Sequence, residues 1–141
     1  MAIRFDKFTV KAQEAVQAAQ SLADQQSHQA IEPEHLLLAL IQQQEGVVGP
    51  LLAKLGAPAD AIRRQVEAEL AKTPTVRGGA GQYASARLQA VFERAQSEAE
   101  RLRDEYVSAE HLLIAIAQDR EGAAGRVLAA SGVTAEAIYK A

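Results

Sequence analysis

The sequence predicts an all-α fold made of two copies of a four-helix unit. Alanine supplies about 30 of the roughly 68 apolar residues, while aromatic residues make up only 4% of the chain, and this bias favours helix over strand. The chain also repeats itself: residues 8–65 and 84–141 align without a gap and share about 20 identities in 58 positions. Within each copy the apolar residues recur at helical spacing, so we expect a tandem, pseudo-two-fold pair of helical units.

The repeat is clearest where Ile31–Leu40 is echoed by Val107–Ile116. We interpret the 141 residues as a single domain that consists of repeat 1 (8–72), a linker (73–83) and repeat 2 (84–141). The linker contains proline and three glycines, which do not sustain a helix. The same glycines lack the Gly-Lys-Ser/Thr ending of a phosphate-binding loop, so we interpret them as connector.

Helix-start and helix-stop residues delimit the first unit. Thr9 is a candidate N-cap of the first helix, and Pro33 suits the first position of the second. The six apolar residues of Leu36–Ile41 predict a helix that is buried on every side. A short third helix should stop at Gly56, a candidate left-handed residue, and Pro58 should open the fourth.

The second unit follows the same scheme. Its first helix should run through residues 88–102, and Ser108 should cap the second. Leu112–Ala117 is a second uninterrupted apolar run and should be buried against its twin. Gly132 should end the third helix and Thr134 should cap the fourth.

Composition excludes several function classes. The absence of cysteine excludes a disulfide framework, a thiolate metal site and a thiol nucleophile. A net charge of -3 gives no general attraction to nucleic acid or anionic lipid, so we expect neither as a partner. With no long apolar run and no signal peptide, we expect a cytoplasmic protein. We interpret His28, His35 and His111 as structural residues, and we expect no metal site and no catalytic residue.

Several motifs resemble a known family. They occur at Phe8–Ala15, Ala19–Ala23, Ile31–Leu37 and Leu51–Gly56. These stretches are similar to the amino-terminal (Clp repeat) domain of the AAA+ Clp ATPases, a tandem pair of four-helix repeats. Two further stretches, Thr73–Gly81 and Asp104–Leu113, resemble the ClpB disaggregase chaperones in particular. The resemblance covers the chain from Phe8 to its end.

The resemblance implies a substrate-engaging domain of an ATP-dependent protein disaggregase. Such a domain binds unfolded or aggregated polypeptides in the heat-stress response, and the complete chaperone is a homohexamer that works with the DnaK system. ATP and magnesium would bind in modules outside these residues, so we expect no cofactor and no enzyme activity in this chain. The fourth helix of repeat 2 has barely begun at Ala141, which suggests a fragment of a longer AAA+ protein. An adaptor-docking domain of a Clp protease ATPase is the alternative, and a free-standing hydrolase is a weaker third interpretation.

The resemblance also nominates substrate-binding residues, namely Thr9, Asp104 and Glu110. Val10 departs from the family pattern, in which many relatives carry a polar or acidic residue, and it should expose an apolar side chain beside Thr9. We expect Asp104 to serve function more than stability. A salt bridge from Asp104 to Arg101 or Arg103 is the structural alternative.

The internal repeat supports this division of roles. Glu110 has the twin Glu34, and an acid is favoured near the helix N-terminus where both lie. Thr9 has the twin Ser85, and both residue types can cap a helix. Asp104, in contrast, aligns with a histidine in the first unit, and it follows a helix C-terminus, where an acid is disfavoured. Replacing Asp104 by alanine should therefore leave the melting temperature nearly unchanged while lowering disaggregation by the whole chaperone.

Overall fold

The computed structural model describes residues 3–75 and 81–141, and in this part of the chain the eight predicted helices are all present. Val76, Gly78 and Gly79 of the predicted linker lie outside the described residues. The first unit consists of η1 (Phe5–Lys7), α1 (Val10–Gln25), β1 (Ala30–Ile31), α2 (Pro33–Gln42), α3 (Val48–Lys54) and α4 (Ala59–Ala71). The second consists of β2 (Tyr83–Ala84), α5 (Ala86–Arg101), α6 (Ala109–Ala117), α7 (Ala123–Ala130) and α8 (Ala135–Lys140).

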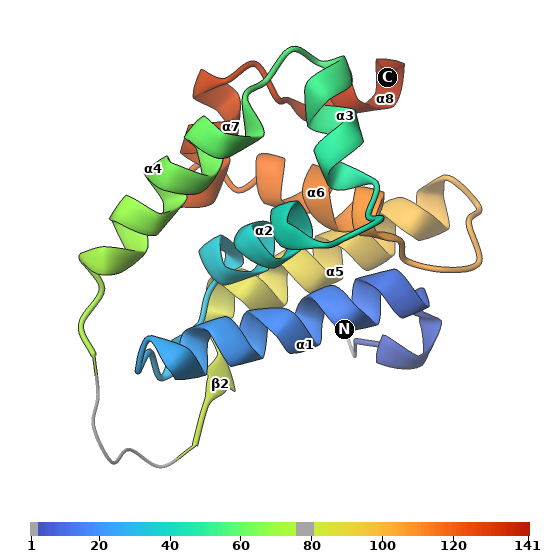
Figure 1. The fold of residues 1–141 in the computed structure, drawn as a ribbon. Coiled ribbons are helices and arrows are strands. Elements are labelled where there is room, and N and C mark those ends of the chain that lie inside the picture. Colours follow the sequence, from blue (N-terminus) through green and yellow to red (C-terminus); the bar gives the residue numbers. More distant parts are fainter. Residues whose placement is uncertain (1–2, 76–80) are drawn as a thin grey trace.

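Helices α2 and α6 lie in the middle of the fold and contact each other, as predicted from their apolar runs. Figure 1 shows α1 and α5 on one side of this pair and α3, α4, α7 and α8 on the other. Leu36–Leu40 and Leu112–Ala117 are buried, and only Ile41 at the end of the first run is partly exposed. A helix surrounded on all sides can be apolar on all sides, which explains why these two segments lack polar residues.

The two units are linked by matching backbone pairs, which the all-α prediction missed. β1 and β2 pair in parallel, with Ile31 opposite Ala84, and an isolated parallel bridge joins Phe8 to Val107. These two pairs are equivalent under the repeat, because each joins the residue two positions before the first helix of one unit to the residue two positions before the second helix of the other. The pairing therefore follows the pseudo-two-fold symmetry of the repeats. Such two-residue strands have no periodicity of their own, so sequence analysis could not find them.

The helix ends agree with most of the sequence predictions. Pro33 occupies the first turn of α2, and Gly56 and Gly132 have φ values of +73° and +78°, the left-handed conformation that glycine adopts at low cost. One detail differs, because Pro58 precedes α4 as its N-cap instead of opening the helix. Phe8 precedes the cap of α1, and its extended backbone forms the bridge to the second unit.

A partly buried ionic cluster ties the two units together. Arg87 on α5 donates to Glu34 Oε2 on α2 over 2.9 Å and to Asp119 Oδ2, after α6, over 3.1 Å. Glu34 Oε2 also accepts the backbone N–H of Ala124 at the start of α7, over 2.9 Å. Burial disfavours the guanidinium charge, but the two carboxylates outweigh it and raise the pKa of Arg87 above its ordinary value. Helix α5, helix α2 and the loop after α6 therefore meet at the Arg87 guanidinium, and α7 joins them through Glu34. We call this set Arg87, Glu34 and Asp119 the clamp.

Candidate functional site

The loop after α5 presents Asp104 at the surface. The chain leaves the helix through Arg103, whose φ is +60°, and Asp104 N–H donates to Ala99 O over 2.8 Å. The first unit has the same helix ending, in which Ser27 has a φ of +57° and His28 N–H donates to Ala23 O. This is the Schellman pattern. In both units it directs the next residue, His28 or Asp104, toward the start of the following helix.

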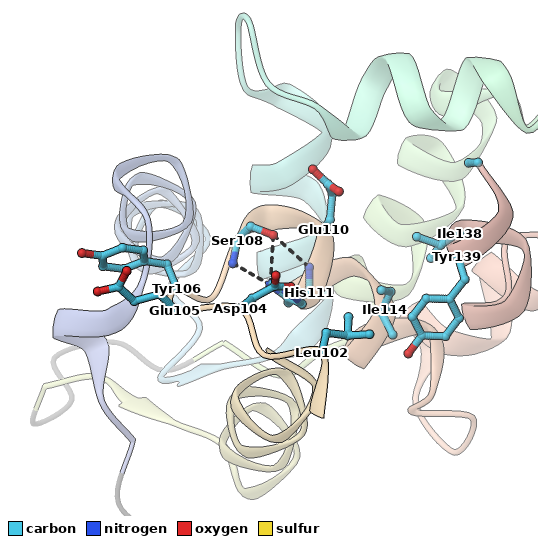
Figure 2. Close-up of a pocket in the computed structure, with 11 residues that line it drawn as sticks. Leu102, Asp104, Glu105, Tyr106, Ser108, Glu110, His111, Ile114, Ile138 and Tyr139 are labelled. Atoms are coloured by element: carbon cyan, nitrogen blue, oxygen red, sulfur yellow. Dashed lines mark hydrogen bonds and ion pairs between the residues drawn. The ribbon is translucent and has the colours of Figure 1, made fainter. Parts of the chain in front are cut away.

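Asp104 faces His111 of α6, as Figure 2 shows. His111 Nδ1 accepts the backbone N–H of Ser108 over 2.9 Å, so in the neutral ring the proton is on Nε2. Nε2 lies 2.9 Å from Asp104 Oδ2 and donates to it. The imidazole is buried and the Asp104 carboxylate is half-exposed, so the pair joins the interior to the surface.

The first unit has a histidine where the second has Asp104. His28 Nδ1 lies 3.0 Å from His35 Nε2, and His35 Nδ1 accepts the backbone N–H of Glu32 over 2.9 Å. Both imidazoles are buried. Burial, and then the nearby His28, lower the pKa of His35 from 6.5 to about 4. The predicted structural role of the histidines thus takes a specific form, because His35 and His111 each bond back to the N-cap residue of their helix.

The structural alternative for Asp104, a salt bridge to Arg101 or Arg103, is not what the structure shows. The structure places Asp104 against His111, and Arg101 instead pairs with Glu98 on the preceding turn of α5. Two features explain the difference. Asp104 lies beyond the end of α5, so its side chain leaves that helix face, and the Schellman turn directs it to α6. The sequence did contain a signal for the contact with His111. Asp104 aligns with His28, and each of them lies seven residues before the equivalent histidines, His111 and His35.

Asp104 and Glu110 lie on one surface groove of about 500 Å³, which we call the acidic groove. Its other lining residues include Leu102, Glu105, Tyr106, Ser108, His111, Ile114, Ile138 and Tyr139. Glu110 projects from the first turn of α6 and is exposed. Two of the three nominated residues are therefore brought together by the loop between α5 and α6.

Glu110 and its twin Glu34 have different environments. Glu34 is 5% exposed and is held in the clamp, whereas Glu110 is exposed. The repeat alignment places Lys11 at the position of Arg87 and Gln43 at that of Asp119. The equivalent place around Glu110 therefore has a lysine in place of the arginine and an amide in place of the second carboxylate. Lys11 donates instead to Gln44 O over 3.1 Å. The shared helix-start position explains an acid at both places, but only Glu34 is itself buried and paired with an arginine.

Thr9, the third nominated residue, lies outside the lining of the acidic groove but is connected to it. Its backbone N–H donates over 2.9 Å to the carbonyl of Val107, which lies between Asp104 and Glu110 in the chain. Its hydroxyl accepts the N–H of Ala12 over 3.1 Å, which confirms the predicted cap. The neighbouring Val10 is 72% exposed, as its departure from the family pattern suggested.

Replacing Thr9 by alanine should lower the free energy of unfolding by about 1 kcal/mol, because the N–H of Ala12 loses its acceptor. Ser85→Ala is the matched control, since Ser85 caps α5 through Leu88 N–H over 3.0 Å. Urea denaturation of both variants measures the two caps. If Thr9→Ala lost several times more stability than Ser85→Ala, the hydroxyl of Thr9 would have a further structural role.

A second surface hollow is apolar, and sequence analysis did not predict it. Two adjoining cavities of about 420 and 240 Å³ share Phe5, Val16 and Gln20, and the second also reaches Tyr83, Leu88 and Phe92. We call this surface the apolar groove. Phe5 packs edge-on against Phe92 with 5.3 Å between ring centroids, yet it remains 44% exposed, and Tyr83 is 56% exposed. Its residues come from both units, so only the folded chain assembles it.

The acidic groove contains carboxylates and a histidine, but they are not grouped as metal ligands. Among the described residues no three His, Cys, Asp or Glu side chains are grouped closely enough to hold a metal ion. None of the helices in residues 3–75 and 81–141 is long and apolar enough to span a bilayer.

Comparison with known proteins identifies the family. The model of the Clp repeat (R) N-terminal domain family matches residues 7–131, most of the chain. The chain belongs to the Clp N-terminal domain family. The chaperone protein ClpB of Bdellovibrio bacteriovorus is 39% identical over 134 residues, which cover 94% of this chain and 16% of the relative. ClpB of Nitratidesulfovibrio vulgaris is 43% identical over 117 residues, 80% of this chain and 14% of the relative. The chain thus spans about one-sixth of the length of these ClpB relatives.

Solved structures support the fold of this Clp N-terminal domain. The Hsp104 N-terminal domain from Candida albicans has a TM-score of 0.82 at 24% identity and covers 95% of this chain and 87% of its own. A complex of the ClpV N-domain with VipB peptide has a TM-score of 0.72 at 20% identity and covers 94% of this chain and 82% of its own. At these identities the likeness shows the shared fold alone. The prediction of a duplicated all-α Clp domain is confirmed.

Proposed function

We propose that this chain is the polypeptide-engaging N-terminal domain of a ClpB-type protein disaggregase. In this proposal the domain binds unfolded or aggregated polypeptides in the heat-stress response. The whole protein is a cytoplasmic homohexamer that works with the DnaK system, and its ATP and magnesium bind in modules outside these residues. The ClpB relatives supply the class, and the apolar groove is the observation in this chain that carries the proposal.

The apolar groove supports binding of unfolded rather than folded proteins. An apolar side chain left in water costs free energy, so a hollow that keeps Phe5 and Tyr83 exposed is typical of an interaction surface. Unfolded chains present the apolar side chains that native proteins bury, and they can fit such a hollow without a fixed shape. A groove of this size gives weak binding, which several copies in a ring would strengthen. We propose that Thr9, Asp104 and Glu110 contact the same polypeptide beside it.

Binding of a reduced, carboxymethylated protein that cannot refold tests this function. We expect fluorescence anisotropy to show binding of this probe and none of the same protein in its native form. Phe5→Ser combined with Tyr83→Ser should weaken binding about tenfold or more, because two exposed aromatic contacts are removed. Val47→Ser is the control, since Val47 is 45% exposed but lines neither groove. Equal binding by the double variant and the control would reject the apolar groove as the site.

The second candidate is an adaptor-docking domain, which recognises one particular protein. It is favoured by the structural neighbour that is a ClpV N-domain in complex with VipB peptide. The two candidates differ in selectivity. A disaggregase domain should bind several unrelated unfolded proteins with similar affinity, whereas an adaptor-docking domain should bind none of them and retain a single folded partner.

We also propose that the chain itself binds no nucleotide. No Gly-Lys-Ser/Thr phosphate-binding motif occurs in its 141 residues. Calorimetric titration with Mg-ATP should give no heat beyond dilution, and binding in the micromolar range would contradict this part of the proposal.

A further inference from the structure

Residues 3–8, which we call the N-terminal strap, carry Phe5 to the apolar groove. Figure 1 shows this segment beside the start of α1. Phe5 lines both cavities of the groove, and its ring packs against Phe8 and Phe92 with 5.1 and 5.3 Å between the ring centroids. Phe8 and Phe92 are buried, whereas Phe5 stays partly exposed. The place of this one ring therefore decides the shape of the groove wall.

The strap is attached to the second unit at two places, one on each side of Phe5. Near the end of the strap, the carbonyl of Lys7 accepts the N–H of Val107 over 2.8 Å. Near its start, the N–H of Arg4 donates to Oε1 of Gln96 on α5 over 2.9 Å. The second bond is made by a side chain, so it depends on which residue occupies position 96.

The anchor at Gln96 is sheltered from water. Gln96 is 8% exposed, and a buried polar group is normally hydrogen-bonded. Gln20, which the repeat places at the equivalent position of α1, is exposed and lines the apolar groove. The helix position alone therefore does not bury this side chain. A further bond to the strap, from Nε2 of Gln13 to the carbonyl of Phe5, is longer, at 3.4 Å, and exposed, so water competes for it.

We propose that Gln96 is a positioning residue of the apolar groove, which holds the start of the strap so that Phe5 is in place before a polypeptide binds. This inference rests on the proposed function, because it concerns the same groove. A side chain that is already ordered loses less conformational freedom on binding than one on a loose segment. The anchor therefore raises the affinity for the polypeptide without touching it.

Fluorine NMR tests the effect of Gln96 on Phe5 directly. The chain contains three phenylalanines, so labelling with 4-fluorophenylalanine gives three signals, and Phe5→Leu identifies that of Phe5. Gln96→Met removes the acceptor and keeps an unbranched apolar stem. We expect this variant to move the Phe5 signal toward its position in the unfolded chain and to move the other two signals less. An unchanged Phe5 signal would overturn the inference.

The reduced, carboxymethylated protein measures the consequence for binding. We expect Gln96→Met to weaken its binding about threefold, and to have no further effect in a Phe5→Ser background, because Gln96 acts through Phe5. Thr134→Ala controls for a general loss of stability. It removes the cap of α8, which accepts the N–H of Ala137, and Thr134 does not line the apolar groove. This control should bind like the unchanged chain.

Two substitutions of Arg4 form a second matched pair, which stays informative if Gln96→Met does not fold. Arg4→Pro deletes the N–H that Gln96 accepts and should weaken binding as Gln96→Met does, whereas Arg4→Ala keeps that N–H and should not. Equal binding by the two Arg4 variants, or a full effect of Gln96→Met without Phe5, would overturn the inference and leave the proposed function standing. Undiminished binding by the variant that combines Phe5→Ser with Tyr83→Ser would reject both.

Discussion

Arg87→Ala is expected to lower the free energy of unfolding by about 2–3 kcal/mol, one of the two largest effects that we predict. The substitution leaves Glu34 and Asp119, which are 5% and 9% exposed, without their cation. A carboxylate that is buried without a partner costs several kcal/mol, and we expect less than the full amount because the Arg87 side chain is 39% exposed. Because the clamp joins elements of both units, the loss should affect their association as well as local packing.

Urea denaturation measures this effect, and Arg63→Ala is the matched control. Arg63 pairs with Glu67 over 2.9 Å and with Asp60 over 3.5 Å, all on α4, so its removal should cost only about 0–1 kcal/mol. A Gly122→Ala variant tests the same site without removing a charge. A Cβ at Gly122 would clash with Nη2 of Arg87, so the guanidinium would have to leave its position. If Arg87→Ala cost no more than Arg63→Ala, the clamp would not hold the units together.

Acidification is expected to destabilise the chain through His35, by about 2 kcal/mol between roughly pH 8 and pH 5. The pKa of His35 is lowered from 6.5 to about 4 in the folded state, first by burial and then by His28. The unfolded chain therefore binds a proton in a range where the folded chain does not. The stability that His35 contributes is fully present above pH 6.5 and is lost as the pH falls from there toward about 4.

The geometry explains why the charged form is disfavoured. Nδ1 of His35 already accepts the N–H of Glu32, so a second proton on the ring would face that N–H. On the other side of the ring, Nε2 carries the proton of the neutral form and donates it to Nδ1 of His28. Nδ1 of His35 is therefore the only ring nitrogen that a second proton could occupy. A further titratable group on the same turn is the carboxylate of Glu32, which accepts the backbone N–H of His35 in the capping box.

His35→Gln should remove this part of the pH dependence, while His111→Gln, in the equivalent position of the second unit, should retain it. The measurement is the difference in the free energy of unfolding between the two pH values for each variant. An NMR titration of the His35 ring gives the pKa directly and stays informative if the variant is unstable. A His35 pKa near 6.5, or equal pH dependence in both variants, would contradict the prediction.

Part of the candidate site could be predicted from the sequence. The sequence predicts Thr9 as a cap, because capping depends on a side chain and the N–H three residues later, both within one short stretch. The special position of Asp104 followed from comparing the two units, since its counterpart is a histidine. Its bond to His111 could not be predicted, because the Schellman turn after α5 decides the direction of the side chain.

The apolar groove could not be predicted, because it depends on distance in the folded chain rather than along the sequence. Phe5, Val16 and Phe92 belong to three elements from both units, and each residue alone fits the pattern of a core position. Phe92 is buried and Phe5 is partly exposed because different neighbouring residues pack over the two rings in the folded chain.

The sequence by itself determined the repeat, the eight helices and the two central ones. The constant spacing between residues 8–65 and 84–141 aligns the two units. The apolar runs Leu36–Leu40 and Leu112–Ala117 require burial on all sides, and both are buried. The tertiary structure decided how the equivalent residues differ. Glu34 and Glu110 share one helix-start position, but only Glu34 is buried against Arg87. The physical reason is that local patterns fix hydrogen bonds within a helix, whereas the partner of a charged side chain comes from another part of the chain.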